Sequence, residues 1–378
     1  MRFAASILTC SMLLLAACQP EPPSENAEAE RPAPTEATID LEMGAADGDE
    51  AFLFGQIAGV TVDADGRIIV VDWQGNTVRA YANDGAFLYT IATPGEGPGE
   101  VNRPCCPSIG PEGHLWVRDD QNRRYAQFQL TDEGATPGRT IPMEHTHFGL
   151  RARTTFDADG HVIDVGTASR EGASRSVKTR FHRTAERETV REVALPQAPM
   201  ERLGMIQIDQ NGGTARYSMP YGTQERDAHA RNGDFAYAVD DQYAVVRFDA
   251  HGDTLHVLSR TPPPVPFSDD ERASVEETLQ RMAGFMEVPV RDLERKVPDV
   301  KNPLRALFFD QAHRLWVQRA VPEGAPNEAD VYAPDGTLVQ VVQWPEDISL
   351  AQGYLTEDTL YGIRSGADTF PQVVRLRY

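Results

Sequence analysis

Short apolar runs alternate with polar turns along this chain in a phrase that recurs about every 47 residues. In the clearest copy, the apolar residues 60–62 precede a polar turn at 63–66, and a second apolar run follows at 68–71. Glycine at such turns adopts positive φ without strain, and Asp or Asn tolerates it. The turn position recurs at Gly66, Gly113, Gly160 and Gly233, then at residues 311–313 and 357–358.

A third apolar run, ending in an aromatic residue, and then another turn complete most copies. The aromatic residues are Tyr81, Phe128, Phe181, Phe248 and Tyr332. A hairpin-rich unit cannot bury its apolar face alone, so neighbouring units must stack. Six copies of a four-stranded unit predict an all-β fold, the six-bladed β-propeller. A seventh blade remains open, because residues 196–228 are long enough to contain another hairpin.

The last unit lacks one strand, because only the apolar run near residues 371–376 remains before Tyr378. An unpaired edge there would expose free backbone groups. Residues 38–42 alternate polar and apolar side chains, so we predict that this N-terminal strand closes the last blade.

A small helical insert is predicted at about 267–300, between blades four and five. Ser268 and Glu271 have the spacing of a capping box, and a second short helix is expected between Pro289 and Pro298. One face of the first helix carries Val275, Leu279, Met282 and Met286. We expect this stripe to pack on the propeller; a partner groove and a mobile lid are the alternatives.

The N-terminus predicts export and a lipid anchor. A charged start and a short apolar run precede Cys18, and residues 15–18 resemble the lipobox of bacterial lipoproteins. The resemblance implies a signal peptide at 1–17 and acylation of Cys18, with palmitate among the acyl groups. Residues 18–37, rich in Pro and Glu, are expected to be a disordered tether. Gln19 favours the outer membrane, facing the periplasm or the cell surface; an ordinary signal peptide or a buried helix is the alternative.

The formal net charge of −21 over 378 residues disfavours nucleic acid as a partner. Residues 59–78 and 95–100 resemble an NHL-type repeat. The chain from 38 to 378 resembles the bacterial six-bladed β-propeller lipoproteins, a group largely without assigned activity. The resemblance implies a monomeric propeller in the cell envelope.

Two adjacent cysteines, Cys105 and Cys106, enter blade two between prolines. With Cys10 removed and Cys18 acylated, each of these two thiols has only the other as a possible disulfide partner. Two alternatives remain open: a disulfide between the neighbouring residues, or a pair of partly buried free thiols. The disulfide would make a stiff platform or a redox switch.

Basic residues stand out against the acidic background near the predicted starts of inner strands. They are Arg103, His145, His147, Arg151, His229, Arg231, Lys301 and Arg305. We take Arg103, His147, Arg151, His229 and Arg305 as candidate binding residues for an anionic ligand at the funnel of the ring. Solvated loop charges explain the same pattern.

No catalytic motif is found: the chain has no Gly-x-Ser-x-Gly and no His-Glu-x-x-His. The sequence therefore favours a binding or scaffold module for a protein or a small anionic ligand, without a cofactor. The alternative is a metal-dependent propeller hydrolase or lyase, lactonase-like or amidating-lyase-like, with one divalent cation at the axis. No set of residues in this chain can be matched one by one to the axial metal ligands of such enzymes.

Overall fold

The computed structural model describes residues 31–143, 155–157, 159–168, 177–184, 188–210, 213–366 and 369–378. The chain divides into two units, Met1–Arg31 and Pro32–Tyr378, and the following description concerns the second. Within the described ranges, neither of the two α-helices combines the length and the apolar character needed to cross a bilayer.

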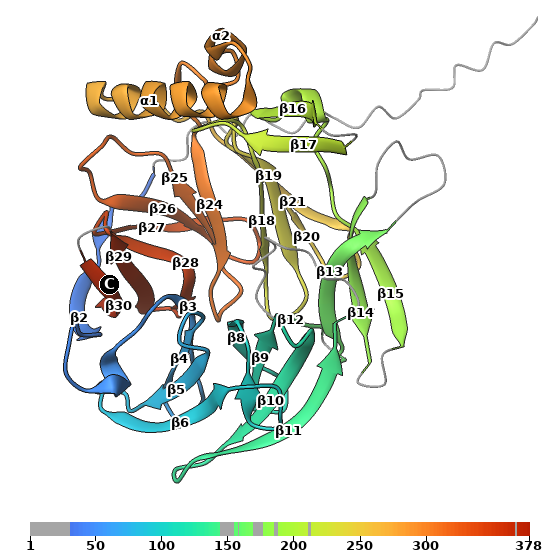
Figure 1. Ribbon diagram of the computed structural model, residues 1–378, viewed down its shortest axis with the longest axis vertical. Helices are drawn as coiled ribbons and strands as arrows, with labels where there is room; N and C mark the ends of the chain where they lie inside the picture. Colours follow the sequence, from blue (N-terminus) through green and yellow to red (C-terminus); the bar gives the residue numbers. More distant parts are fainter. Residues whose placement is uncertain are drawn as a thin grey trace, which may run out of the picture. The chain divides into compact units, whose positions relative to one another are not determined.

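Six sheets follow one another around a centre, each with its first strand innermost (Figure 1). Blade one contains β3 (Ile57–Val62), β4 (Ile68–Asp72), β5 (Thr77–Tyr81) and β6 (Phe87–Pro94), with β7 (Glu100–Val101) at its edge. Blade two contains β8 (Pro104–Ile109), β9 (Leu115–Asp119), β10 (Arg124–Leu130) and β11 (Ala135–Pro142). Blade three contains β12 (Thr155–Phe156), β13 (Val162–Ala168), β14 (Val177–Arg183) and β15 (Thr189–Ala194).

The second half of the ring repeats this order. Blade four contains β18 (Glu225–His229), β19 (Phe235–Val239), β20 (Ala244–Phe248) and β21 (Thr254–Ser259). Blade five contains β24 (Leu304–Phe309), β25 (Leu315–Arg319), β26 (Asn327–Tyr332) and β27 (Leu338–Trp344). Blade six contains β28 (Ile348–Leu355), β29 (Thr359–Gly366) and β30 (Thr369–Arg377) from the C-terminus. The predicted six-bladed ring is confirmed.

The N-terminal segment completes the last blade, as predicted. Strand β2 (Thr38–Met43) pairs antiparallel with β30, from Thr38 opposite Arg377 to Met43 opposite Val373. Strand pairing begins before the predicted residue 38, because β1 (Thr35–Glu36) pairs in parallel with β27 of blade five. The segment therefore joins two neighbouring blades.

Apolar side chains of neighbouring blades form the core between them. Val71 of blade one packs in one cluster with Val117 of blade two, and Trp316 of blade five packs in another with Leu360 of blade six. Both Trp316 and Trp344 are fully buried. This packing makes each blade depend on its neighbours, as the repeat pattern predicts.

Buried aspartates at the ends of the second strands fix where the inner strands begin. Asp72 Oδ1 accepts a hydrogen bond from the backbone N–H of Gln56 at 3.0 Å. Asp119 Oδ1 accepts one from the N–H of Asn102 at 2.8 Å. Asp240 plays the same part in blade four. Satisfied in this way, a buried carboxylate stabilises the blade instead of costing desolvation energy.

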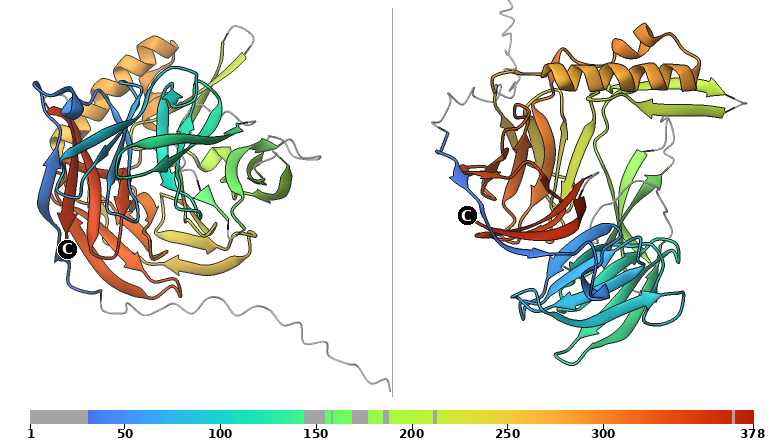
Figure 2. Two further views of the ribbon diagram at one scale, coloured as in Figure 1. Left: turned by 90° about the horizontal axis from the view of Figure 1, so that it is seen from below. Right: turned by 60° about the vertical axis from the view of Figure 1, so that its left-hand side comes forward.

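Two insertions pack together beside the ring. The helices α1 (Asp269–Met286) and α2 (Val290–Glu294) confirm the predicted insert, and the capping box of Ser268 and Glu271 is present. Residues 205–218 form only a hairpin, β16 (Met205–Gln210) with β17 (Gly213–Ser218), and no seventh blade. Figures 1 and 2 show this hairpin alongside α1, and Met219 shares a core cluster with Leu279 and Met286.

Three short elements complete the described chain. They are the 3₁₀-helices η1 (Glu50–Phe52) and η2 (Met200–Arg202), and the ladder of β22 (Val265–Pro266) with β23 (Val300–Lys301), from which the helical insert extends.

Replacing Asp40 with asparagine should weaken the closure of the ring. Asp40 Oδ1 accepts a hydrogen bond from Arg375 Nε at 2.8 Å, and Oδ2 accepts one from Arg377 Nε at 3.1 Å. Burial alone would raise the pKa of Asp40, but these two arginines outweigh it and hold the pKa below its usual value. We expect the free energy of unfolding in urea to fall by about 1 kcal/mol at pH 7.

This contribution has a defined pH dependence. A lowered carboxyl pKa stabilises the fold above the unfolded value of about 3.9 and is lost as the pH falls through the folded value. The difference between wild type and Asp40→Asn should therefore shrink towards pH 3. Asp47→Asn, at an exposed position, is the control. A difference that stays constant from pH 7 to pH 3 would contradict the role given to Asp40.

Candidate anion site at the propeller axis

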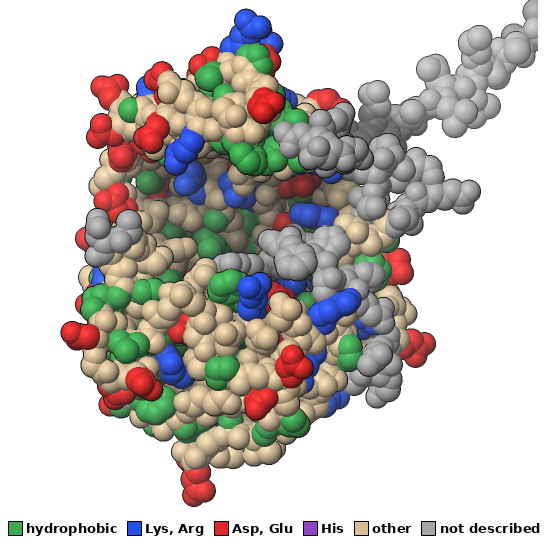
Figure 3. Space-filling view, in the orientation of Figure 1, with side chains coloured by type: hydrophobic (Ala, Val, Ile, Leu, Met, Phe, Trp, Pro, Cys, Tyr) green, Lys and Arg blue, Asp and Glu red, His purple; other side chains and the backbone are tan. Residues whose placement is uncertain are grey.

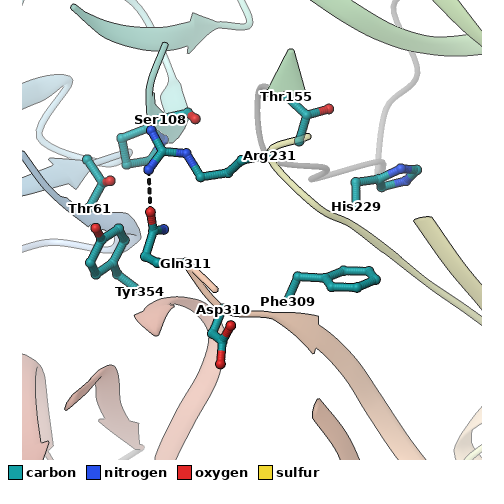
Figure 4. A pocket seen from close by; sticks show the side chains of 10 residues that line it. Thr61, Ser108, Thr155, His229, Arg231, Phe309, Asp310, Gln311 and Tyr354 are labelled. Carbon is teal, nitrogen blue, oxygen red and sulfur yellow. Dashed lines mark hydrogen bonds between the residues drawn. The ribbon is translucent and has the colours of Figure 1, made fainter. Parts of the chain in front are cut away.

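The inner strands of all six blades meet around a narrow pocket, the axial pocket (Figure 4). Since every blade contributes to its wall, it lies on the axis of the ring. Its lining comprises Thr61, Pro107, Ser108, Thr155, His229, Arg231, Phe309, Asp310, Gln311 and Tyr354. The pocket has a volume of about 20 Å³, which is room for one or two water molecules. Only a group of about the size of a carboxylate fits without movement of the walls.

Arg231 reaches across this pocket from blade four. Its Nη1 donates a hydrogen bond to Oε1 of Gln311 in blade five (Figure 4). Its Nη2 donates to the carbonyl oxygen of Ile109 in blade two. Both acceptors are neutral. Among the residues that the structure describes, no carboxylate lies within the 4.0 Å of an ion pair with Arg231. Burial lowers the pKa of this guanidinium, with Tyr354 opposing the effect.

The carboxylate in the pocket wall, Asp310, is already neutralised. Its Oδ2 accepts hydrogen bonds from Arg314 Nε at 2.6 Å and from Trp316 Nε1 at 3.0 Å. Its Oδ1 accepts from two backbone N–H groups of the same turn. Among the described residues that line the pocket, the charge without a counter-ion is therefore the positive charge of Arg231.

Three hydroxyl side chains surround the same space, one from each of the first three blades. Thr61, Ser108 and Thr155 line the pocket and are 2%, 7% and 4% exposed, so they are shielded from bulk water. Hydroxyl groups and a guanidinium all donate hydrogen bonds to an oxyanion, and the charged donor contributes most. The arrangement is suited to the oxygen atoms of a small carboxylate.

His229 lies in the wall as a neutral, oriented imidazole. Its Nε2 is 3.0 Å from Oδ2 of Asp227, and its Nδ1 is buried without a hydrogen-bond partner. Burial lowers the pKa of His229, and the charge of Arg180 adds to this, against the hydrogen bond to Asp227. A proton on Nε2 leaves Nδ1 with a free lone pair.

A metal-binding group at the axis is not found among the described residues. The three residues close enough together to hold an ion are Asp157, Asp159 and His161, in a turn of blade three. The oxygen atoms of Asp157 already accept hydrogen bonds within that turn and from His182. At the axis itself, the charge of Arg231 would repel a divalent cation.

Two of the predicted binding residues, Arg103 and Arg305, lie at the other end of the inner strands, which we call the entry face. The guanidinium carbon of Arg103 is 5.1 Å from the centre of the Trp73 ring, and that of Arg305 is 5.7 Å from the Tyr221 ring. Both arginines are exposed, and neither makes an ion pair within the described ranges. They belong to blades two and five, which face each other in a ring of six.

Figure 3 shows a hollow in the molecular surface below α1, with Lys and Arg side chains on its walls.

The prediction that His229 and Arg231 lie near the start of an inner strand was wrong. His229 is the last residue of β18, and the turn after it spans residues 230–233, so Arg231 lies in that turn. His145, His147, Arg151 and Cys18 lie outside the described residues.

A disulfide joins Cys105 to Cys106 in β8. Both residues are buried against Ala58 and Trp73, and Cys106 has a φ of 61°, in the left-handed region. The next two residues of this strand, Pro107 and Ser108, line the axial pocket. The cysteine pair therefore helps to fix the pocket wall and does not itself contact the free space.

Sequence reasoning missed most of the pocket lining. Thr61, Ser108, Thr155 and Tyr354 each hold the second-last position of their inner strand. The available signal was a polar side chain recurring at one position of the repeat, within otherwise apolar runs. This recurrence can be recognised only after the inner strands of the six copies have been aligned with one another.

Comparisons with known proteins agree with this architecture. Residues 46–143 match a family model described as a 6-bladed beta-propeller. The structure is similar to a candidate exported protein from Bacteroides fragilis, with a TM-score of 0.50 at 10% identity over 90% of this chain and 94% of the other. The protein is a six-bladed β-propeller.

Two further solved structures align with this propeller at lower similarity. Virginiamycin B lyase from Staphylococcus aureus gives a TM-score of 0.42 at 11% identity, over 89% of this chain and 98% of that chain. A candidate gluconolactonase gives 0.38 at 15% identity, over 92% and 93%. No curated protein sequence matches this one.

Acidification below about pH 6.5 should destabilise the propeller before its carboxylates titrate. The pKa values of His229 and His182 are both lowered, mainly by burial. The unfolded chain then binds protons that the folded chain does not, so stability falls as the pH falls below the unfolded histidine value of about 6.5. His229→Gln should reduce the drop in melting temperature between pH 7.5 and pH 5.5, whereas His251→Gln, at an exposed position, should not. Equal drops in both variants and the wild type would refute the buried, neutral state of His229.

Proposed function

We propose that this propeller is a binding module of the bacterial cell envelope that holds a small carboxylate ligand at its axis. The observation that carries the proposal is Arg231, which crosses the axial pocket without a carboxylate partner among the described residues. A buried charge without a counter-ion costs free energy, and a bound anion would recover it.

The charge distribution supports this ligand class. The chain carries a formal net charge of −21, so most of its surface repels anions. An exposed positive site on such a protein is selective, because the field that attracts a carboxylate exists only near it. Arg103 and Arg305 on the entry face supply that field at the opposite ends of two inner strands from the axial pocket. We infer that they attract the ligand and that Arg231 holds its carboxylate.

The small size of the axial pocket limits what is held. With room for one or two water molecules, it takes the anionic end group of a ligand and excludes the rest. The body of the ligand would then lie against the wall of the ring, towards solvent. Direct hydrogen bonds to a guanidinium and to neutral hydroxyl groups suit a carboxylate that binds reversibly.

The location rests on the sequence. The apolar run before Cys18 and the Pro- and Glu-rich residues after it support a lipid anchor and a tether to the propeller. We propose that the acylated Cys18 holds the propeller at the outer membrane. The ligand would then be captured close to the membrane surface.

Replacing Arg231 with glutamine should abolish anion binding. In thermal unfolding with formate, acetate or succinate, against chloride at matched ionic strength, the wild type should show a saturable rise in melting temperature. At 100 times the dissociation constant, this rise corresponds to about 2.7 kcal/mol. Arg231→Gln should show no rise, and Arg231→Lys should keep a reduced one, because the charge is retained without the planar pair of donors.

Arg281→Gln is the matched control, since Arg281 is exposed on α1. Arg231 also bonds to two other blades, so its variants are compared with their own melting temperature in chloride. A carboxylate-dependent rise that survives in Arg231→Gln would reject the axial site.

Replacing Cys18 with alanine should abolish lipidation, so that the protein is recovered as unprocessed or soluble material. Without the thiol, the resemblance to a lipoprotein signal predicts neither acylation nor cleavage before residue 18. The membrane fraction of cells that express the wild type and the variant should differ, and metabolic labelling with palmitate should mark only the wild type. Labelling of both proteins would place the acyl group elsewhere.

A further inference from the structure

A second and larger cavity lies between blades four and five, and we call it the blade 4–5 cleft. Its volume is about 390 Å³, within the range of small-molecule sites. It shares no residue with the axial pocket. Four segments of the chain form its walls: residues 241–244, 259–265, 300–303 and 319–320. They come from both blades and from the ladder that carries α1 and α2.

One side of the cleft is apolar and stiff. Pro262, Pro263 and Pro264 follow β21 in sequence, and Val265 starts the short ladder with β23. The ring of proline fixes φ, so three in succession keep this wall in place without a ligand. Ala244 and Ala320 lie in the other walls. A preformed apolar surface of this kind favours binding of an apolar body with little loss of entropy.

The charged side chains of the cleft are mainly positive. Arg260, Lys301 and Arg319 line it, against one carboxylate, Asp241. Asp241 is occupied by Arg202, whose Nη2 and Nε lie 2.6 Å and 2.9 Å from its two oxygen atoms. The local excess of positive charge stands out in a chain with a net charge of −21.

The three positively charged side chains differ in how completely nearby carboxylates balance their charges. Lys301 Nζ is 2.5 Å from Oε1 of Glu271 and is therefore paired. Arg319 is 3.8 Å from the nearest oxygen atoms of Glu328 and Asp330, too far for a hydrogen bond, and its buried Nε has no hydrogen-bond partner.

Arg260 has the least compensation of the three. Within the described part of the chain, no carboxylate makes an ion pair with it. Its charge and a side-chain hydrogen bond to Tyr332 oppose the rise in the pKa of that tyrosine. Its side chain is partly exposed at the cleft. It is therefore placed to meet an incoming anion.

We propose that the blade 4–5 cleft binds a small organic carboxylate with an apolar body. Arg260 and Arg319 would take the carboxylate, and the wall from Pro262 to Val265 would take the body. Arg260, which makes no ion pair among the described residues, and Arg319, whose buried Nε has no hydrogen-bond partner, argue for the negative charge. The apolar wall beside them argues against a bare inorganic anion. A carboxylate at this position would complete the hydrogen bonding of Arg319 and the charge balance of Arg260. This site is independent of the axial pocket.

The test uses 4-phenylbutyrate as the probe, with 4-phenylbutyramide as its neutral isostere, in isothermal titration of the purified protein. The acid should bind saturably and the amide at least about 10-fold more weakly, the equivalent of 1.4 kcal/mol. Arg260→Gln should weaken the acid by about 10-fold or more and leave the affinity for the amide unchanged. Unchanged affinity for the amide in this variant would show that the cleft itself is intact, so that the weaker binding of the acid reports the lost charge.

Two controls separate this site from others. Arg295→Gln alters an arginine that is 76% exposed beside α2, and it should not change the affinity for the acid. Arg231→Gln should leave it unchanged as well, because that residue lies at the axis. Equal affinity for acid and amide would overturn the proposal, as would full affinity in Arg260→Gln. Loss of binding in Arg231→Gln would place the acid at the axis instead, and the absence of saturation up to about 10 mM would exclude the site.

Discussion

The pairing of β2 with β30 is the interaction on which the rest of this structure depends. A ring of sheets has no free edge only when its first and last segments meet, and here they meet within one blade. Asp40 adds two hydrogen bonds to arginines of β30. The parallel pairing of β1 with β27 extends the contact to blade five. Closure therefore holds the terminal blade against both the chain start and its neighbour.

Closure also determines what happens at the axis. When six inner strands converge, little space remains between them, and each blade presents between one and three residues there. Five of the blades present neutral or neutralised groups, among them Thr61, Ser108 and Thr155. Blade four presents Arg231, and its hydrogen bonds to Gln311 and to Ile109 connect three blades across the centre. The same guanidinium thus contributes to the ring and leaves a positive charge for a ligand.

Much of the fold could be predicted because its determinants are local and repeated. The turn glycines have positive φ as expected, and His313 takes the same conformation in blade five, with a φ of 59°. The capping box of Ser268 depends on two residues that are three apart, so it could also be predicted from the sequence. The contact between α1 and the β16–β17 hairpin was not, because it joins two insertions whose apolar residues have no shared period.

The axial pocket was harder to predict than the fold, because its determinants are not local in the sequence. A basic residue near a turn can lie at either end of an inner strand, and the choice depends on the strand's length. His229 and Arg231 were placed at the wrong end because blade four has drifted from the repeat. Whether an arginine is paired depends on how the side chains are arranged in space: Arg314 pairs with Asp310, four residues before it. Asp227 also lies four residues before an arginine, Arg231, but it contacts His229 instead, and Arg231 has no carboxylate partner among the described residues. Sequence spacing contains no information on that difference.

The central claim is that the charge of Arg231 is available to a carboxylate at the axis. Nitrogen-15 NMR of the arginine side chains, recorded during a titration with formate, tests it most directly. The account predicts one Nε–Hε resonance that shifts with saturation and is missing from the spectrum of Arg231→Lys. If no Nε–Hε resonance saturates, or if the shifting resonance persists in Arg231→Lys, the axial anion site does not exist.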